Sequence, residues 1–270
     1  MDEKAVMVID FHTHIFPDAI ASRAITSLAE SINYLYHPVT NGSKTELLQR
    51  MDEWGVDVSV AMPVITKPSQ HVKTNDFAKS ATDGRVISFG GIHPDTDDYK
   101  RDVDYVVSLG LKGIKLHPEY QNFKIDEPKM MNVYDYILSK GLMIMFHAGA
   151  DPAYKPPFRS SPRAFRKILD EMKGGVIIAA HLGGHAQWDD VEKYLVGTDI
   201  YLDTSMGTEY YSEEQFLRIV KNHTKGHILF GSDSPWSNAK NEISRILSMD
   251  LTEEEKADIL GDSARKLLNI

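Results

Sequence analysis

The chain has 270 residues, of which 42% are hydrophobic, and this is enough for one large core or at most two smaller domains. It contains no cysteine, which excludes disulfides, thiolate metal ligands and a cysteine nucleophile, so any transition-metal site must use His, Asp or Glu. The net charge of −9 argues against non-specific binding to nucleic acid or to an anionic membrane.

Eight short apolar runs recur along the chain, and segments with helical periodicity lie between them. The expected strands are residues 6–10, 56–62, 86–92, 113–116, 142–146, 176–180, 200–204 and 227–231. The expected helices are residues 44–53, 98–109, 128–140, 161–172, 189–195, 213–222 and 239–248. This alternation predicts a parallel sheet, and eight strands predict an α/β fold of the (β/α)₈ TIM-barrel type. We expect a single domain over residues 1–270, with one or two extra helices after Thr252.

Two connections are longer than a barrel needs. Residues 15–43 and residues 148–160 both exceed the roughly 2–6 residues that usually join a strand to the next helix. Such extended loops at the carboxyl ends of barrel strands often cover an active site. We therefore expect these two loops to wall a substrate pocket.

Histidines gather at the predicted carboxyl ends of the strands, which is the edge where barrel enzymes carry their chemistry. Six of the eleven lie there: His12, His14, His93, His117, His147 and His181. Side chains two residues apart on a strand share a face and lie about 6.6 Å from each other. Asp10, His12 and His14 can thus all point toward the barrel axis, and both imidazoles can reach one ion.

Three later motifs each end a hydrophobic strand in one ionisable side chain. They are MFHAG (residues 145–149), AHLGG (residues 180–184) and FGSDSPW (residues 230–236). With the two N-terminal histidines they supply three or four nitrogen ligands and one carboxylate, a set that suits Zn²⁺, Fe²⁺, Mn²⁺ or Co²⁺. If one side of the set is open, it is a catalytic metal site. The residues alone do not divide the ligands from a catalytic base.

The same stretches carry a family resemblance over nearly the whole chain. DFHTH from Asp10, GIKLHP from Gly113, FHAG from Phe146, AHLGG from Ala180 and GSDSPW from Gly231 resemble, in this order, the amidohydrolase superfamily. They look closest to its amidohydrolase-2 group, which contains aminocarboxymuconate semialdehyde decarboxylase and related aromatic acid decarboxylases.

The resemblance implies a distorted (β/α)₈ barrel that holds one divalent metal ion. Carried over residue by residue, the metal ligands would be His12, His14, His147 and Asp233. His181 would act beside the metal-bound water as a general acid or base, and Asp233 would share the proton transfers. Zn²⁺ is the first expectation for the metal, with Mn²⁺, Fe²⁺ or Co²⁺ as alternatives.

Lys115 leaves the number of metal ions open. In binuclear relatives a carboxylated lysine on the fourth strand bridges two metals, whereas in the amidohydrolase-2 group this lysine is read as unmodified. We expect one metal, with Lys115 as a positive charge near the substrate and His117 on the same strand face. TatD-type nucleases also have HxH and a GIHP stretch like residues 91–94. Their bridging glutamate is replaced here by GIKLH, which argues against a nuclease.

For function we expect a metal-activated water that attacks an amide, ester or lactone of a small molecule. The alternative is a metal-dependent, non-oxidative decarboxylase of an unsaturated or aromatic carboxylic acid, and a second alternative is a barrel that binds metal without catalysis. Arg159 is a candidate for binding a substrate carboxylate. Trp236 and Phe16 are candidates for lining the pocket.

The partners and the compartment follow from what the sequence lacks. No apolar run approaches the roughly 20 residues of a membrane span, and the acidic N-terminus does not resemble a signal peptide. We therefore expect a cytoplasmic protein with a small-molecule substrate and with neither a nucleic-acid nor a membrane partner. Because relatives in the resembled group are often dimers, a homodimer is considered as well.

Overall fold

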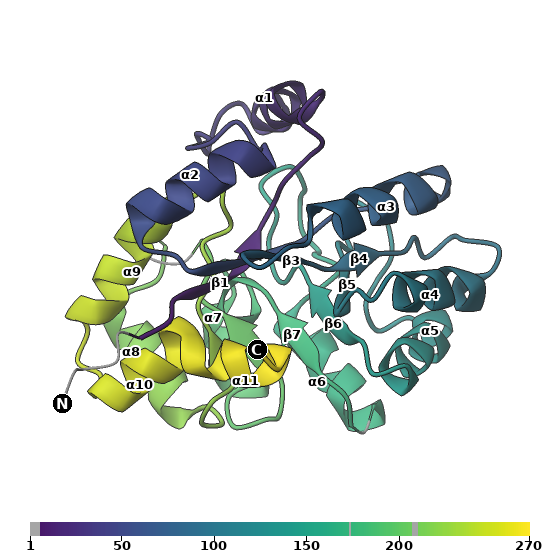
Figure 1. Cartoon of the computed structure of the whole chain (residues 1–270). Coiled ribbons are helices and arrows are strands. Elements are labelled where there is room, and N and C mark those ends of the chain that lie inside the picture. The colour runs from purple at the N-terminus through teal and green to yellow at the C-terminus, as the bar shows by residue number, and fades with distance from the viewer. Residues whose placement is uncertain (1–5, 173, 207–209) are drawn as a thin grey trace.

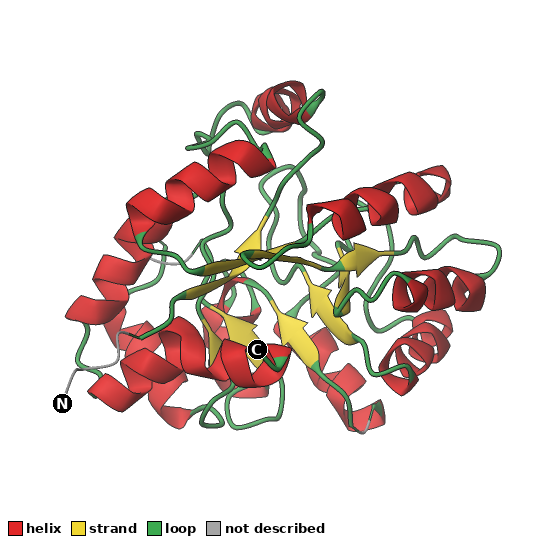
Figure 2. Ribbon diagram, viewed as in Figure 1, coloured by secondary structure: helices red, strands yellow, loops and turns green. Residues whose placement is uncertain are grey.

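The computed structural model describes residues 6–172, 174–206 and 210–270. In this part of the chain parallel strands form two sheets, in the orders β1-β2-β3 and β4-β5-β6-β7-β8-β9. Helices surround the strands, as Figure 2 shows, and the predicted (β/α)₈ barrel is confirmed. The strands are β1 (Ile9–Thr13), β2 (Val58–Ala61), β3 (Val86–Ser88), β4 (Gly90–Gly91), β5 (Gly113–Leu116), β6 (Met143–Phe146), β7 (Ile177–Ala179), β8 (Tyr201–Asp203) and β9 (Ile228–Leu229).

Two connections link the two sheets. The predicted strand 86–92 is divided at Phe89 into β3, which pairs with β2, and β4, which pairs with β5. On the other side, the Phe11 N–H donates to the Phe230 carbonyl at 2.8 Å. The Asp233 N–H donates to the His12 carbonyl at the same distance. The start of the chain therefore lies beside the segment that follows β9.

The helices follow the predicted alternation, with two additions. The described helices are α1 (Ala21–Ser31), α2 (Lys44–Trp54), α3 (His71–Ala81), α4 (Tyr99–Ser108), α5 (Pro128–Ser139), α6 (Pro162–Glu171), α7 (Trp188–Tyr194), α8 (Glu213–Asn222), α9 (Ala239–Ser248), α10 (Glu253–Ala257) and α11 (Ser263–Leu268). A π-helical stretch, η3 (Asp258–Asp262), joins the last two, and short 3-10 turns lie at η1 (Pro68–Gln70) and η2 (His181–Gly183). Neither α1 nor α3 is predicted from the sequence. None of the described helices has the length and apolar character to cross a bilayer.

Alternate strand positions divide the hydrophobic side chains into two layers. On β6, Met143 and Met145 belong to the cluster that also contains Leu268 of α11, whereas Ile144 and Phe146 pack in the larger cluster with the helices. His147 continues the series of Met143 and Met145. The apolar inner layer thus ends, at the carboxyl end of the strand, in an ionisable side chain.

The loop after β1 reaches far from the barrel. In Figure 1 the chain runs from the arrowhead of β1 outward to α1 before it returns to α2. Leu28 and Ile32, from α1 and its C-terminal end, line the cavity above the strands together with Tyr36. The long loop predicted at residues 15–43 therefore carries a helix that covers the pocket.

Gly149 holds the loops after β6 and β7 together, and its replacement by alanine should destabilise the fold. Its φ is +83°, and a Cβ would lie 2.2 Å from the His185 backbone nitrogen. The adjacent backbones are bonded, with the Ala150 N–H donating to the His185 carbonyl at 2.9 Å. We expect Gly149→Ala to cost roughly 2–4 kcal/mol, from left-handed strain and overpacking.

The midpoint of urea unfolding measures this loss, and Gly141→Ala is the matched control. Gly141 also has a positive φ, +73°, but no atom within 4 Å of its Cβ position. It should lose only the conformational part, about 1 kcal/mol. Equal losses in the two variants would show that the contact with His185 contributes nothing.

Candidate active site

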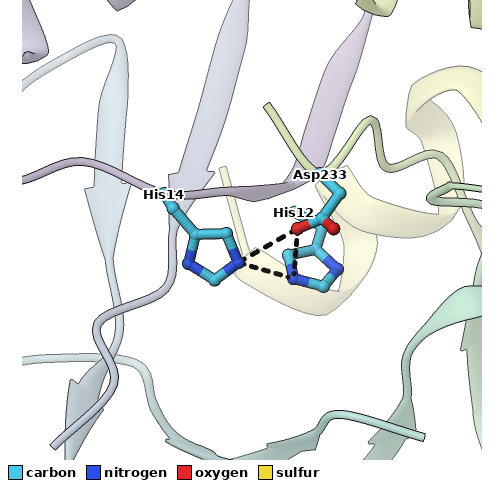
Figure 3. Close-up of side chains that lie close together, drawn as sticks. All are labelled: His12, His14 and Asp233. Atoms are coloured by element: carbon cyan, nitrogen blue, oxygen red, sulfur yellow. Dashed lines mark hydrogen bonds and ion pairs between the residues drawn. The ribbon is translucent and has the colours of Figure 1, made fainter. Parts of the chain in front are cut away.

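Three ligand atoms converge where β1 ends beside the turn that follows β9 (Figure 3). His12 Nε2 lies 3.2 Å from His14 Nε2 and 3.3 Å from Asp233 Oδ1. His14 Nε2 lies 3.0 Å from the same carboxylate oxygen. Two imidazole nitrogens and one carboxylate oxygen at such spacing are a ligand set for a divalent transition metal.

The Nδ1 atoms of both imidazoles point away from the ligand group and lie within hydrogen-bond distance of acceptors. His14 Nδ1 lies 2.7 Å from the Met62 carbonyl, which can only accept, so this nitrogen carries the proton. His12 Nδ1 lies 2.9 Å from Asp203 Oδ2. Both Nε2 atoms are therefore unprotonated and can coordinate a metal ion, which is how proteins orient histidine ligands. Asp233 Oδ1 is buried without a hydrogen-bond partner, so the residues fit a metal ion.

Asp233 owes its position to a buried network that starts at Asp10. The Ser232 N–H and hydroxyl donate to the Asp10 carboxylate at 2.9 and 2.5 Å. β1 is irregular between Asp10 and Thr13, so Asp10 turns to Ser232 instead of joining His12 and His14 as the alternation predicts. Burial raises the pKa of Asp10 to about 7. Burial also acts to raise the pKa of Asp233, but the neighbouring imidazoles of His12 and His14 outweigh it and lower that pKa.

A chain of hydrogen bonds sets the protonation of His181 and His147. The Ser205 hydroxyl donates to Asp203 Oδ1, so its oxygen accepts from His181 Nδ1 at 3.0 Å. His181 Nε2 is then unprotonated and accepts from His147 Nδ1 at 3.1 Å. This leaves His147 Nε2 with a free lone pair, and that atom is buried without a partner. Burial lowers the pKa of His181 to about 3, so its ring is neutral at pH 7.

His147 is not part of the group of three in Figure 3. Its ligand atoms group instead with those of His117 and Asp151, and a further group combines His12 with His181 and Asp203. The free Nε2 of His147 is compatible with the predicted role of a fourth ligand. That role, and the division between ligands and catalytic base, stay predictions.

Lys115 is a buried cation beside these ligands. Its Nζ lies 3.3 Å from His12 Nε2, and its side chain belongs to the pocket lining. Burial lowers its pKa to about 8, although the charges of Asp203 and Asp233 oppose the shift. The amine therefore lies where it can meet an anionic group of a substrate bound next to His12.

The cavity above these residues has a volume of about 200 Å³, which is below the roughly 300–1,000 Å³ of sites for drug-sized ligands and so favours a smaller molecule. Phe16, Trp236 and His117 are among the residues that line it, and their contact with a substrate stays a prediction. Most of the exposed lining is apolar, contributed by the loop after β1, by α1 and by the loops after β2 and β6. His93, although it ends a strand, is not among the residues that line the cavity.

Arg159 is not among the described residues that line the cavity, and its binding of a substrate carboxylate stays a prediction. Its guanidinium donates to Glu119 Oε2 at 2.8 Å and to Asn122 Oδ1 at 2.7 Å. The Ile125 N–H also donates to the Arg159 carbonyl at 3.1 Å. Because these donors are engaged within the protein, Arg159 joins the loop after β6 to the loop after β5.

Several residues of the site are not singled out by the sequence alone. Asp203, the last residue of β8, contacts His12, and its Oδ1 accepts from the His181 N–H at 3.1 Å. Tyr120 and Asp151 line the cavity from loops. The signal for Asp203 was its place in YLDTS at the carboxyl end of a predicted strand, whereas the two loop residues carried no comparable signal.

The fold and the metal-binding side chains together define the class of protein. A parallel α/β barrel with imidazole and carboxylate groups converging at the carboxyl ends of its strands is that of a metal-dependent barrel enzyme. The family model for Amidohydrolase, of the amidohydrolase-2 type, matches residues 9–270. The chain belongs to this family, whose members bind a divalent metal.

No curated protein sequence matches the chain. Solved structures with the same fold include 5-carboxyvanillate decarboxylase from Novosphingobium aromaticivorans, complexed with manganese and 4-hydroxy-3-methoxy-5-nitrobenzoic acid (TM-score 0.72, 12% identity, covering 99% of this chain and 97% of that one). Another is 2,6-dihydroxybenzoate decarboxylase complexed with 2,6-dihydroxybenzoate (TM-score 0.70, 14% identity, 98% and 99%). A third is a probable 2-pyrone-4,6-dicarboxylic acid hydrolase from Acinetobacter baumannii with citric acid bound (TM-score 0.67, 14% identity, 97% and 99%).

Proposed function

We propose that this chain is a metal-dependent, non-oxidative decarboxylase of a small aromatic or unsaturated carboxylic acid. The observation that carries the proposal is the convergence of His12, His14 and Asp233 beneath a small, mainly apolar cavity. Two structures with the same fold support it, because both are named as decarboxylases and both are complexed with an aromatic acid. The hydrolase interpretation, favoured from the sequence, has support from one hydrolase of this fold.

The residues around the cavity suit a flat acid. Phe16, Tyr120 and Trp236 offer aromatic surface, and Leu28 and Ile32 add aliphatic surface from above. Lys115 is the one lysine or arginine among the described lining residues, and it lies beside the metal-binding group. A substrate would therefore place its carboxylate near Lys115 and its apolar body against the aromatic rings.

The metal would be held by His12, His14 and Asp233, with His147 as the fourth ligand. When bound, a divalent cation supplies positive charge that polarises a substrate oxygen and lowers the pKa of bound water. Decarboxylation breaks the bond between the carboxylate and its carbon, and the electron pair left on that carbon takes up a proton. We assign the transfer of this proton to His181 and Asp233, because both line the cavity.

A substrate panel with two readouts tests the function. Protein loaded with Zn²⁺ or Mn²⁺ is assayed with aromatic and unsaturated acids, lactones and amides, for CO₂ release and for hydrolysis in the same samples. We expect CO₂ from at least one acid, and no CO₂ after the metal is removed by a chelator. Hydrolysis of a lactone or amide with no CO₂ from any acid would establish the hydrolase interpretation instead.

A further inference from the structure

A buried carboxylate lies in the wall of the cavity, and the proposed reaction does not use it. Asp151, in the loop after β6, is 5% exposed and lines the cavity. Its Oδ1 accepts from the Ala153 N–H at 2.8 Å, and the Tyr120 hydroxyl also donates to the carboxylate. His117 Nε2 lies 3.5 Å from its Oδ2. The carboxylate is thus built into the wall by the loops after β5 and β6.

No lysine or arginine in the described part of the chain pairs with Asp151. Its ion-pair contact there is with the His117 imidazole, whose Nε2 lies 3.5 Å from Asp151 Oδ2. Lys115 lies against His12, and Arg159 is engaged with Glu119. Burial raises the pKa of Asp151 to about 6, so the carboxylate is still mostly ionised at neutral pH.

The surroundings of Asp151 are also held rigidly. The His117 ring is stacked between two other rings, with centroid distances of 3.9 Å to Tyr120 and 4.2 Å to His147. The Arg159 N–H and guanidinium both donate to Glu119, which joins the two loops that carry these residues. A carboxylate fixed in the cavity wall has lone pairs left beyond these bonds, and it favours a ligand that donates a hydrogen bond to it.

We propose that Asp151 determines substrate specificity: it accepts a hydrogen bond from a hydroxyl or amino group of the acid and disfavours a second carboxylate. The inference rests on the proposed function, since it assumes an acid whose reacting carboxylate lies near Lys115. It narrows the substrate class to monocarboxylic acids that carry a neutral hydrogen-bond donor. Two structures of the same fold are named for acids with additional carboxylates, 5-carboxyvanillate and 2-pyrone-4,6-dicarboxylic acid, so this chain would differ from them.

Equilibrium binding to the metal-loaded protein tests the assignment. The ligands are benzoate, 3- and 4-hydroxybenzoate, and benzene-1,3- and 1,4-dicarboxylate. For the unchanged protein we expect one hydroxybenzoate to bind at least about tenfold more tightly than benzoate, and both dicarboxylates to bind more weakly than benzoate. Asp151→Asn keeps the shape of the side chain and removes its charge. It should reduce the hydroxyl preference to less than about threefold and improve binding of a dicarboxylate.

The control variant is Asp250→Asn, which makes the same change at a side chain that is 90% exposed, and it should leave the order of affinities unchanged. Metal content is measured in each variant and should stay at the value of the unchanged protein. The proposal is overturned if dicarboxylates bind the unchanged protein as tightly as hydroxybenzoates, if no acid binds, or if Asp151→Asn keeps the original order or loses metal. The affinities come from equilibrium binding and do not depend on catalytic turnover. The expected order with no CO₂ release would therefore reject the decarboxylase and retain the role of Asp151.

Discussion

Replacement of Asp233 by alanine is expected to remove the metal ion from the protein and with it all activity. Asp233 supplies the one carboxylate in the group with His12 and His14. Loss of an outer-shell partner of a metal ligand already costs roughly 10–100-fold in metal affinity, and loss of a ligand should exceed this. Metal content per chain, measured by elemental analysis after dialysis, should fall from about one to below about a tenth.

The conformation of Asp233 calls for a second variant. Its φ is +65°, which alanine tolerates poorly, so Asp233→Asn separates the loss of charge from a loss of folding. Asp135→Ala, at an exposed carboxylate of α5, should keep both metal and activity. If folded Asp233→Asn and Asp233→Ala proteins still hold one metal each, the ion lies elsewhere. The group of His12, His181 and Asp203 would then be the first alternative.

The barrel could be predicted from sequence because its signals are local. Apolar runs and helical segments alternate, and the site histidines His147 and His181 lie within two residues of the carboxyl ends of β6 and β7. The prediction of β1 was less accurate. Residues 6–10 were expected, whereas the strand spans Ile9–Thr13, because the polar pair at Asp10 and His12 continues the strand instead of ending it.

The two unpredicted helices lack the signals that were used to find the others. α1 has apolar residues at helical spacing, but its N-cap residue is Ile20, which makes no side-chain capping bond. α3 buries His71 and Asn75 instead of large apolar residues, so its periodicity is weak. Asn75 is buried because it bonds both the N–H and the carbonyl of Gly91, at 2.8 and 2.9 Å. That contact depends on the tertiary fold.

The site shows the same division between local and tertiary information. His12, His14 and Asp233 could be grouped in advance, since parallel strands bring their carboxyl ends to one edge. The partners of Arg159 could not be predicted. The sequence around a loop arginine does not distinguish one that faces a substrate from one that, as here, contacts Glu119. Asp203 needed the structure too, since its role depends on facing His12 across the barrel.

Replacement of His181 by asparagine is expected to leave the metal in place and to remove most of the activity. His181 lies outside the group in Figure 3, but it lines the cavity. Its φ is +57°, and asparagine tolerates this left-handed conformation better than alanine does. A positioned acid or base contributes roughly 10²–10⁴-fold to rate, so the turnover rate of the best substrate should fall within that range.

His185→Asn is the matched control, since His185 also lines the cavity but belongs to none of the three candidate metal groups in the described residues. It bonds the Tyr36 hydroxyl through Nε2 at 3.3 Å, and its loss should change turnover far less than the loss of His181. Metal content and turnover are measured on the same samples, and thermal unfolding verifies that both variants fold. If His181→Asn loses its metal, His181 is a ligand and not the proton-transfer residue. If it keeps both metal and full turnover, the proton reaches the substrate carbon through Asp233 without His181.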